Sequence, residues 1–132
     1  MDKQQFIEAV TAGEHTLYRV ARAILRMEVD QQDAIQEAVT KAWAKRGALR
    51  DERYFTTWLV RILINECRAI CRKQARIVLL DRWAEDALGT QGPDPRTDLD
   101  AAMDALPERL RLPVVLHYIE GFQLREIAGM LH

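Results

Sequence analysis

Residues 56–76 constrain the fold of this chain more than any other segment, because their polar and apolar side chains separate around a helix axis. At about 100° per residue, one quadrant of the helix carries a basic face, which consists of Arg61, Asn65, Arg68, Arg72 and Arg76. The opposite side carries Leu59, Ile62, Leu63, Cys67 and Ile70. We therefore expect the apolar side to pack into a helical core and the basic face to stay exposed.

An aromatic segment with the sequence RYFTTW, residues 53–58, leads into this helix. Cations bind phosphates and aromatic rings stack on unpaired bases, so the segment and the basic face together are suited to holding opened DNA. Both features also have a purely structural interpretation. Phe55 and Trp58 could close the core, which we expect of at least one of them, and the arginines could form an ordinary solvated helix face.

Composition and charge narrow the class of protein. The 132 residues are enough for one domain or two small helical ones, and a hydrophobic content of 48% can fill a core. No apolar run approaches the ~20 residues that span a bilayer, and the N-terminus lacks the order of a signal peptide, so we expect a cytoplasmic protein. The formal net charge is −1, but residues 41–76 contain ten Lys or Arg against three Asp or Glu. A polyanion would therefore bind the middle of the chain.

The sequence gives no sign of catalysis or of a bound cofactor. Cys67 and Cys71 are the only cysteines, and they lie one helical turn apart without a nearby histidine, which favours buried thiols over a metal or redox site. The three histidines, at positions 15, 117 and 132, are scattered along the chain. We therefore expect no enzyme, no cofactor and no metal site.

Four amphipathic helices are predicted before residue 77. The first begins near Phe6, and the second runs to about Arg26. Asp30 is the expected N-cap of the third helix, which ends at Gly47, and Thr56 is the expected N-cap of the fourth.

Residues 77–98 are predicted to form a flexible linker, because glycines and prolines cluster at residues 89–95. Helical periodicity then returns and is expected to continue through Pro107, with a kink or restart at Pro113. Gly121 should end that helix, and another should follow it.

No stretch follows the strand period for more than a few residues, so the predicted class is all-α. The expected organisation is a four-helix domain, residues 1–76, and an incomplete helix-turn-helix domain, residues 99–132, joined by the linker. The sequence leaves open whether the two domains pack together or move apart.

The third predicted helix carries a second distinctive surface. An acidic strip, formed by Asp33, Gln36, Glu37 and Thr40, lies at helical spacing on the side opposite its apolar residues. A strip of this kind is often only a solvated helix face. Carboxylates interleaved with hydrogen-bonding side chains could also dock onto a basic partner helix.

In this order, the features resemble the extracytoplasmic-function sigma factors, the small specificity subunits of bacterial RNA polymerase. DAIQEAVTKAW at residues 33–43 is similar to the polymerase-docking helix of that family, and FTTWLVRILIN at residues 55–65 to its promoter-melting segment. LPERLR at residues 106–111, with EG at 120–121 and EIA at 126–128, is similar to the start of its −35 element domain. The resemblance covers most of the chain.

The resemblance implies roles for individual residues. The acidic strip would bind the clamp helices of the largest polymerase subunit, and an anti-sigma factor would be a further partner. The resemblance and the local charge together predict DNA contacts by Arg53, Tyr54, Phe55, Thr57, Trp58, Arg61, Asn65, Arg68, Arg72 and Arg76. The helix expected to bind the −35 major groove is absent from these 132 residues, so we expect a fragment or a natural truncation.

The predicted function is to direct polymerase to promoters and to melt the −10 element without ATP, because captured bases stabilise the open state. Two other functions remain open. The chain could be a truncated decoy that occupies polymerase or an anti-sigma protein, or a helical scaffold for protein partners unrelated to transcription.

Overall fold

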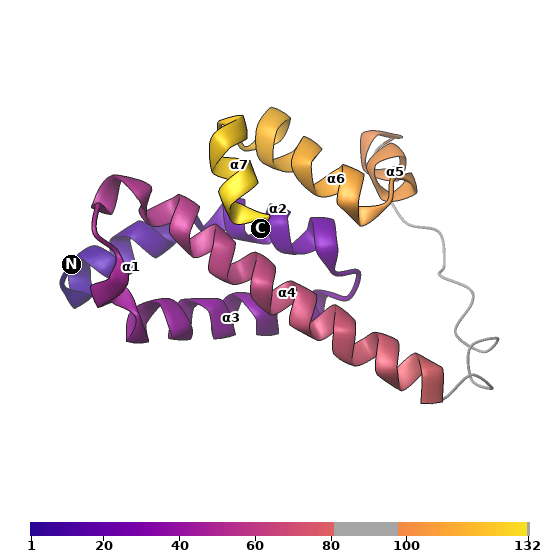
Figure 1. Cartoon of the computed structure of the whole chain (residues 1–132), viewed down its shortest axis with the longest axis horizontal. Helices are drawn as coiled ribbons and strands as arrows, with labels where there is room; N and C mark the ends of the chain where they lie inside the picture. Colours follow the sequence, from indigo (N-terminus) through magenta and orange to yellow (C-terminus); the bar gives the residue numbers. More distant parts are fainter. Residues whose placement is uncertain (81–97, 132) are drawn as a thin grey trace.

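The computed structural model describes residues 1–80 and 98–131, and every regular element in these two ranges is helical (Figure 1). The α-helices are α1 (Lys3–Ala12), α2 (Glu14–Ile24), α3 (Glu28–Ala44), α4 (Phe55–Leu80), α5 (Asp98–Ala105), α6 (Glu108–Val114) and α7 (Leu124–Met130). Short 3-10 turns, η1 (Arg46–Ala48) and η2 (Glu52–Tyr54), connect α3 to α4, and a π-helical turn, η4 (Val115–Ile119), follows α6. The predicted all-α class is confirmed.

The N-terminal part is the predicted group of four helices, with α4 packed along α3 and α2. Ala34, Ala38 and Ala42 recur at intervals of four residues on α3, and all three are buried. Their small side chains let α3 approach α4 closely. On α4, Leu59, Leu63 and Cys67 are fully buried, while Ile62 and Ile70 are partly buried against the same core. The apolar side predicted for residues 56–76 is therefore the side that packs.

Two predicted helix caps are wrong. The third helix begins at Glu28 after Met27 at the N-cap, and Asp30 instead accepts a hydrogen bond from Gln74 of α4 at 2.6 Å. The fourth helix begins at Phe55 rather than after a Thr56 cap. The turn η2 runs directly into α4, so the first amide groups of the helix follow an existing helical turn.

The ends of both helices also differ from the prediction. Helix α3 ends at Ala44, and Gly47 lies inside η1. Helix α4 continues to Leu80, so residues 77–80 are helical rather than part of a linker. The remainder of the predicted linker, residues 81–97, lies outside the described residues.

The two prolines of the C-terminal part behave differently from expectation. Pro107 does not lie inside a helix: α5 ends at Ala105, and Pro107 is the N-cap of α6. Pro113 lies inside α6, and the helix widens into η4 two residues later, where the Glu120 amide donates to the Val115 carbonyl at 3.0 Å. Pro113 lacks the N–H that would bond to the Arg109 carbonyl one turn earlier, so its direct effect falls on the turn before it and not on η4. Gly121 follows η4 with φ of 77°, a left-handed conformation that glycine adopts without strain.

The C-terminal helices pack onto the N-terminal four, which answers the question that the sequence left open. Helix α6 and η4 lie against α2, and α7 lies against α4 (Figure 1). Leu112, Leu116, Ile127 and Met130 are buried and belong to the same core as the N-terminal helices. Both parts of the chain therefore share one continuous core. None of the described helices is both long and apolar enough to cross a lipid bilayer.

Polar side chains fix the contact between α6, η4 and α2. The Arg111 guanidinium donates to the Ala23 carbonyl at the end of α2 at 2.7 Å, and to the Met103 carbonyl at 2.9 Å. The Glu120 carboxylate, which is almost fully buried, accepts a hydrogen bond from Thr16 at 2.8 Å and pairs with Arg19. These contacts hold the C-terminal helices in a defined position on α2.

Candidate nucleic-acid interface

The three rings that follow the η1 turn have different surroundings. Phe55 is 4% exposed, and its ring makes an edge contact with Phe6 at 5.5 Å between centroids. Phe6 in turn contacts Trp43 at 5.1 Å. Phe55 therefore closes the core, which confirms the expectation that at least one of Phe55 and Trp58 would do so. Its predicted contact with DNA is wrong for this conformation, because the buried ring cannot reach a base.

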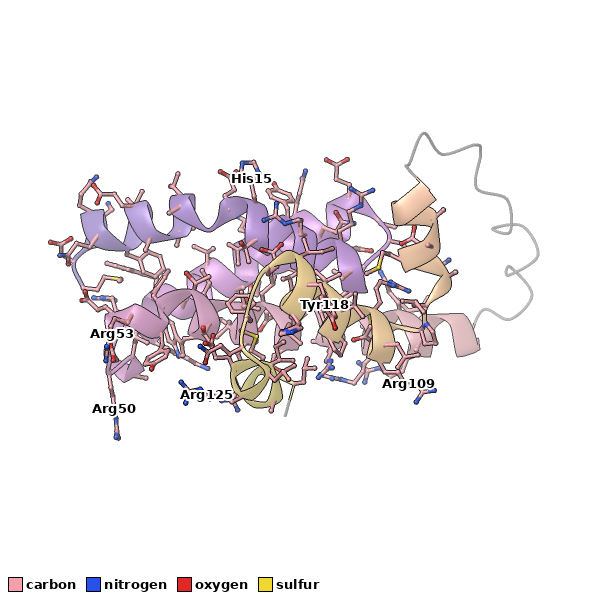
Figure 2. All side chains as sticks on the ribbon, turned by 90° about the horizontal axis from the view of Figure 1, so that it is seen from above. His15, Arg50, Arg53, Arg109, Tyr118 and Arg125 are labelled. Carbon is pink, nitrogen blue, oxygen red and sulfur yellow. The ribbon has the colours of Figure 1, made fainter. Side chains whose placement is uncertain are left out.

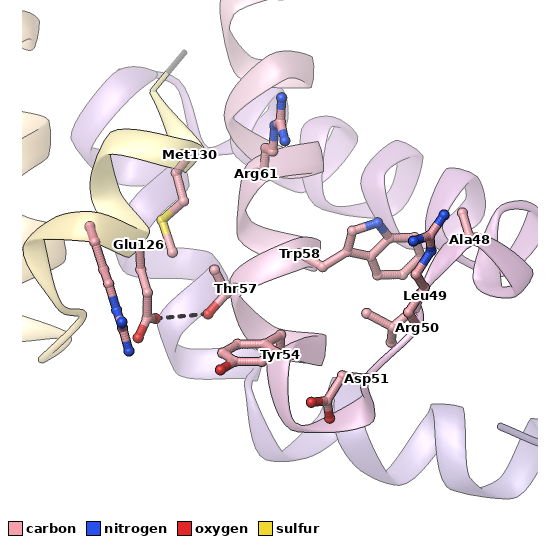
Figure 3. Close-up of a pocket in the computed structure, with 12 residues that line it drawn as sticks. Ala48, Leu49, Arg50, Asp51, Tyr54, Thr57, Trp58, Arg61, Glu126 and Met130 are labelled. Carbon is pink, nitrogen blue, oxygen red and sulfur yellow. Dashed lines mark hydrogen bonds between the residues drawn. The ribbon is translucent and has the colours of Figure 1, made fainter.

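Tyr54 and Trp58 are accessible to a ligand. Tyr54 is 48% exposed, and Trp58 is partly buried against the core. Both rings line a cavity of about 410 Å³ beside the N-terminal end of α4 (Figure 3). Leu49 and Arg50 form another wall, and Met130 of α7 closes a further side. A cavity with two aromatic walls and cationic groups at its margin can accept a flat, polar group such as a nucleotide base.

Charged groups near the cavity form defined pairs. Arg53 donates to the Asp51 carboxylate at 2.8 Å, and this hydrogen bond lowers the pKa of Asp51 and raises the pKa of Arg53. The Arg53 guanidinium also lies 5.9 Å from the centroid of the Tyr54 ring. The Thr57 hydroxyl donates to the Glu126 carboxylate of α7 at 3.0 Å (Figure 3). Arg53 is thus exposed but paired, and Thr57 is partly covered.

The basic face of α4 is largely exposed, as predicted. Arg61, Asn65, Arg72 and Arg76 are all exposed. Arg68 lies at the edge of the face, where its side chain is 33% exposed and its Nε lies 3.6 Å from the Glu108 carboxylate of α6. Three of the four arginines therefore have no ion-pair partner among the described residues, and the fourth, Arg68, pairs with Glu108 of α6.

Positive charge continues beyond α4. Arg50 and Arg53 precede α4, Arg109 belongs to α6, and Arg125 belongs to α7. All four side chains project along one edge of the molecule, opposite the edge that carries His15 (Figure 2). A long polyanion would therefore meet several cations on this edge besides the basic face.

The acidic strip lies on the outer surface of α3. Asp33, Gln36, Glu37 and Thr40 are all exposed, and the buried alanines of α3 face the other way. Within the described part of the chain, neither Asp33 nor Glu37 has an ion-pair partner. The next basic residue, Lys41, pairs with Glu66 of α4 at 2.6 Å, and this contact raises the pKa of Lys41. The strip is therefore an open acidic surface on a helix held firmly by its neighbours.

Comparison with known proteins identifies the family. The family model for Sigma-70 region 2 matches residues 10–77, and the model for Sigma-70 region 4 matches residues 96–132. The chain belongs to the sigma-70 family. As a sigma factor it acts in transcription initiation, and sigma factors are not enzymes, which agrees with the sequence-based expectation.

Individual relatives place this sigma factor in the extracytoplasmic-function group, as predicted. RNA polymerase sigma factor SigV from Bacillus subtilis is 28% identical, over 96% of this chain and 77% of that protein. ECF RNA polymerase sigma factor SigM from Mycobacterium tuberculosis is also 28% identical, over 98% of this chain and 67% of that protein. The fold is similar to that of the sigma factor RpoE from Bartonella quintana, solved in complex with the anti-sigma factor NepR. That similarity has a TM-score of 0.78 at 22% identity, over 97% of this chain and 83% of the other.

Several residues of the sigma factor's candidate site were missed by the sequence analysis. Arg46 stacks over the Trp43 ring, with its guanidinium carbon 3.8 Å from the centroid, and Arg50 forms part of the cavity wall. Both follow α3 in the predicted basic region, so the local charge could have indicated them. Glu126 and Met130 reach the cavity from α7, about seventy residues later in the chain, and no local pattern indicates such a contact.

The two cysteines of the sigma factor have the surroundings predicted for buried thiols. Cys67 is fully buried, and desolvation raises the pKa of its thiol to about 12. Cys71 is partly buried, and desolvation raises its pKa as well. Thiols with raised pKa values are poor nucleophiles and poor metal ligands near neutral pH.

Proposed function

We propose that this sigma factor binds core RNA polymerase through the acidic strip of α3 and melts the −10 element through α4 and the aromatic segment. The observation that supports this best is the shared position of two features. An exposed row of arginines and a cavity walled by Tyr54 and Trp58 meet at the same end of α4. In this proposal, residues 1–76 carry both activities, and residues 99–132 are part of a region 4 domain.

Polymerase docking would use the exposed acids of α3. Asp33 and Glu37 lie one helical turn apart, and Gln36 and Thr40 supply hydrogen-bonding groups between and beyond them. A basic helix laid along α3 could pair with both acids without displacing an internal ion pair. We propose the clamp helices of the largest polymerase subunit as this partner, and the cytoplasm as the place where they meet.

Promoter DNA would then lie along the basic face. Arg61, Arg72 and Arg76 would bind phosphates, and Asn65 would supply a hydrogen-bonding group among them. Phosphate contacts hold the duplex without regard to sequence and keep the −10 element beside the cavity. Arg53, at the start of the aromatic segment, would add to the positive charge that attracts the phosphates.

Melting follows from selective binding of the open state. When thermal motion unpairs a base, Tyr54 and Trp58 offer ring surfaces on which it can stack, while Thr57 offers a hydroxyl. Stacking on an aromatic side chain is worth about 1–3 kcal/mol per base, or roughly 5- to 150-fold in the population of the open state. The cavity binds an extruded base and not a paired one. The free energy of that binding therefore stabilises the open state, and ATP hydrolysis is not needed.

An anti-sigma factor is a further proposed partner. The structure with a similar fold contains the anti-sigma factor NepR. The acidic strip and the basic face are both exposed here, so a protein that covers either surface would block one of the two proposed activities.

The test is a pull-down with core polymerase combined with transcription from a promoter. Glu37→Lys should weaken polymerase capture strongly, because it places a cation where the basic partner docks. Glu8→Lys, the same charge change at an exposed position of α1, should leave capture unchanged. A chain that captures polymerase but supports no transcription would be a decoy, and one that captures no polymerase would be a scaffold of another kind.

A further inference from the structure

The lysine beside the acidic strip of α3 has two carboxylates to choose from. Lys41 follows Glu37 by four residues on α3, which is the spacing and the order in which a glutamate and a lysine pair best along a helix. The positions three and four residues from Glu37 along α3 hold no other cation. A pair between Glu37 and Lys41 is therefore the contact expected of α3 by itself.

The structure shows a different pair. The Lys41 Nζ donates to the Glu66 carboxylate of α4 at 2.6 Å, and Glu37 has no ion-pair partner in residues 1–80 and 98–131. The neighbours of Glu66 three and four positions away on α4 are all apolar, so its own helix offers it no cation there. The side chain of Glu66 is 16% exposed and that of Lys41 is 44% exposed. Water and salt therefore screen this pair less than a pair between fully exposed groups.

The packing of α3 on α4 fixes Glu66 beside Lys41. The two helices lie side by side, and the buried alanines of α3 let them approach closely (Figure 1). Near the start of α3, Gln74 of α4 donates to the Asp30 carboxylate at 2.6 Å, so polar side chains join the helices at two levels. Glu66 is thus a fixed acceptor for Lys41 and not a surface side chain that meets it by chance.

Both carboxylates act on the same ammonium group. The hydrogen bond with Glu66 is the largest cause of the raised pKa of Lys41, and the charge of Glu37 raises that pKa as well. Lys41 therefore lies within electrostatic reach of Glu37 while it is bonded to Glu66. If the bond to Glu66 were lost, Glu37 would be the next acceptor for Lys41.

The polymerase docking proposed above requires an unpaired Glu37. A basic partner helix gains free energy from Glu37 only if no lysine of this chain already neutralises the carboxylate. A lysine lying over Glu37 would also repel such a helix. The partner chosen by Lys41 therefore decides how much negative charge the acidic strip offers to polymerase.

We propose that Glu66 is a positioning residue for polymerase docking, because it holds Lys41 on the side of α4 and so keeps Glu37 unpaired. The inference rests on the docking function proposed for the acidic strip. Glu66 does not have to touch polymerase, since it acts by removing a competitor from Glu37. Without Glu66, Lys41 moves to Glu37 and the strip loses one of its two negative charges.

A double-mutant cycle at positions 41 and 66 tests the proposal. The dissociation constant between fluorescein-labelled chain and core polymerase is measured by anisotropy. Glu66→Gln should weaken binding roughly two- to fivefold, which is the range expected when a helical ion pair forms and a surface charge is misplaced. In a Lys41→Met background the same substitution should have no effect, because no lysine is left to move.

The single variant Lys41→Met separates positioning from a structural ion pair. It should bind polymerase at least as tightly as wild type, because it removes the competitor for Glu37. If the ion pair served only the fold, Lys41→Met would weaken binding as much as Glu66→Gln, and that result would overturn the proposal. An equal effect of Glu66→Gln in both backgrounds would overturn it too, since Glu66 would then act without Lys41.

Glu8→Gln is the matched control. It makes the same change in net charge at an exposed position of α1 and should leave binding unchanged. A loss as large as that of Glu66→Gln would show that only net charge matters, and would overturn the proposal.

Nuclear Overhauser contacts of the Lys41 Hε protons locate the lysine without polymerase. In the wild-type chain these protons should contact the Hγ protons of Glu66, and in Glu66→Gln they should contact those of Glu37. A Lys41 side chain that stays beside position 66 in the variant would overturn the proposal even if binding changed.

Failure of the proposed function has a different outcome. Undiminished binding of polymerase by Glu37→Lys would contradict the docking function proposed for α3. Weak binding by Glu37→Lys together with undiminished binding by Glu66→Gln would contradict only the role of Glu66.

Discussion

The number of arginines that reach phosphates on α4 can be measured from the salt dependence of DNA binding. Arg61, Arg72 and Arg76 are exposed without an ion-pair partner among the described residues, and Arg68 shares its charge with Glu108. Each phosphate contact with duplex DNA changes the slope of log affinity against log salt by about −0.9. Three unpaired arginines therefore contribute about −2.7, and release of Arg68 from Glu108 brings the contribution to about −3.6.

Arg72→Ala isolates one of these contacts. The variant should lower the magnitude of the slope by about 0.9. The factor by which a fourfold rise in salt weakens DNA binding should then be about 3.5 times smaller for the variant than for wild type. Polymerase makes phosphate contacts of its own, so the difference between variant and wild type is the useful quantity. The assay is anisotropy of a labelled promoter fragment with the polymerase complex at several salt concentrations.

The matched control is Lys3→Ala, which removes an exposed cation of α1, a helix that carries no residue of the basic face. The control should lower affinity little and leave the slope unchanged. A slope that Arg72→Ala does not alter, or that both variants alter equally, would refute the assignment of the basic face to phosphate binding.

Three further predictions concern the cavity, the turn before α7 and the core. Trp58→Ala should leave capture by polymerase intact and reduce open-complex formation at least fivefold, measured by heparin-resistant complexes; equal loss of both would indicate a folding role instead. Gly121→Ala should lower the free energy of unfolding by about 1–2 kcal/mol because of the left-handed backbone, whereas Gly129→Ala within α7 should raise it by about 0.5–1 kcal/mol; urea unfolding compares the two, and the same sign for both would contradict this account. The pKa of Cys67 is raised to about 12 in the folded chain, against about 8.5 when unfolded, so the contribution of its neutral thiol to stability is complete below pH ~8.5 and is lost as pH rises toward 12. Urea unfolding at pH 8 and pH 10 should therefore show a larger loss of unfolding free energy for wild type than for Cys67→Ala. Equal losses would refute the raised pKa of Cys67.

The helical period of polar and apolar residues was enough to predict α4, the helix that carries the basic face. On α4, burial of Leu59, Leu63 and Cys67 and exposure of Arg61 and Arg72 follow directly from 100° per residue. The same logic identified the exposed strip of α3. Where apolar and polar residues alternate with a helical period over several turns, the direction of the core is fixed before any tertiary contact is known.

Helix ends were less predictable, because capping depends on tertiary contacts. Asp30 has the chemistry of an N-cap but hydrogen-bonds to Gln74 of α4, a residue 44 positions away. The two prolines show the same limit. Pro107 is the N-cap of α6 and Pro113 lies within that helix, yet each is compatible with either role when only its neighbours in sequence are considered.

The parts of the site that sequence analysis could not find all involve distant segments. Phe55 rather than Tyr54 is buried because Phe6 of α1 offers its ring a partner. Glu126 reaches Thr57 because α7 docks on α4. Contacts between residues 49 and 69 positions apart leave no periodic signal in a single sequence.

Permanganate probing of unpaired thymines in a promoter tests the central proposal most directly. Core polymerase with this sigma factor should make thymines of the −10 region reactive without ATP, and Tyr54→Ala with Trp58→Ala should abolish most of that reactivity while polymerase remains bound. Reactivity that requires ATP, or that the double variant retains in full, would contradict the proposal that α4 and its aromatic cavity hold the opened strand.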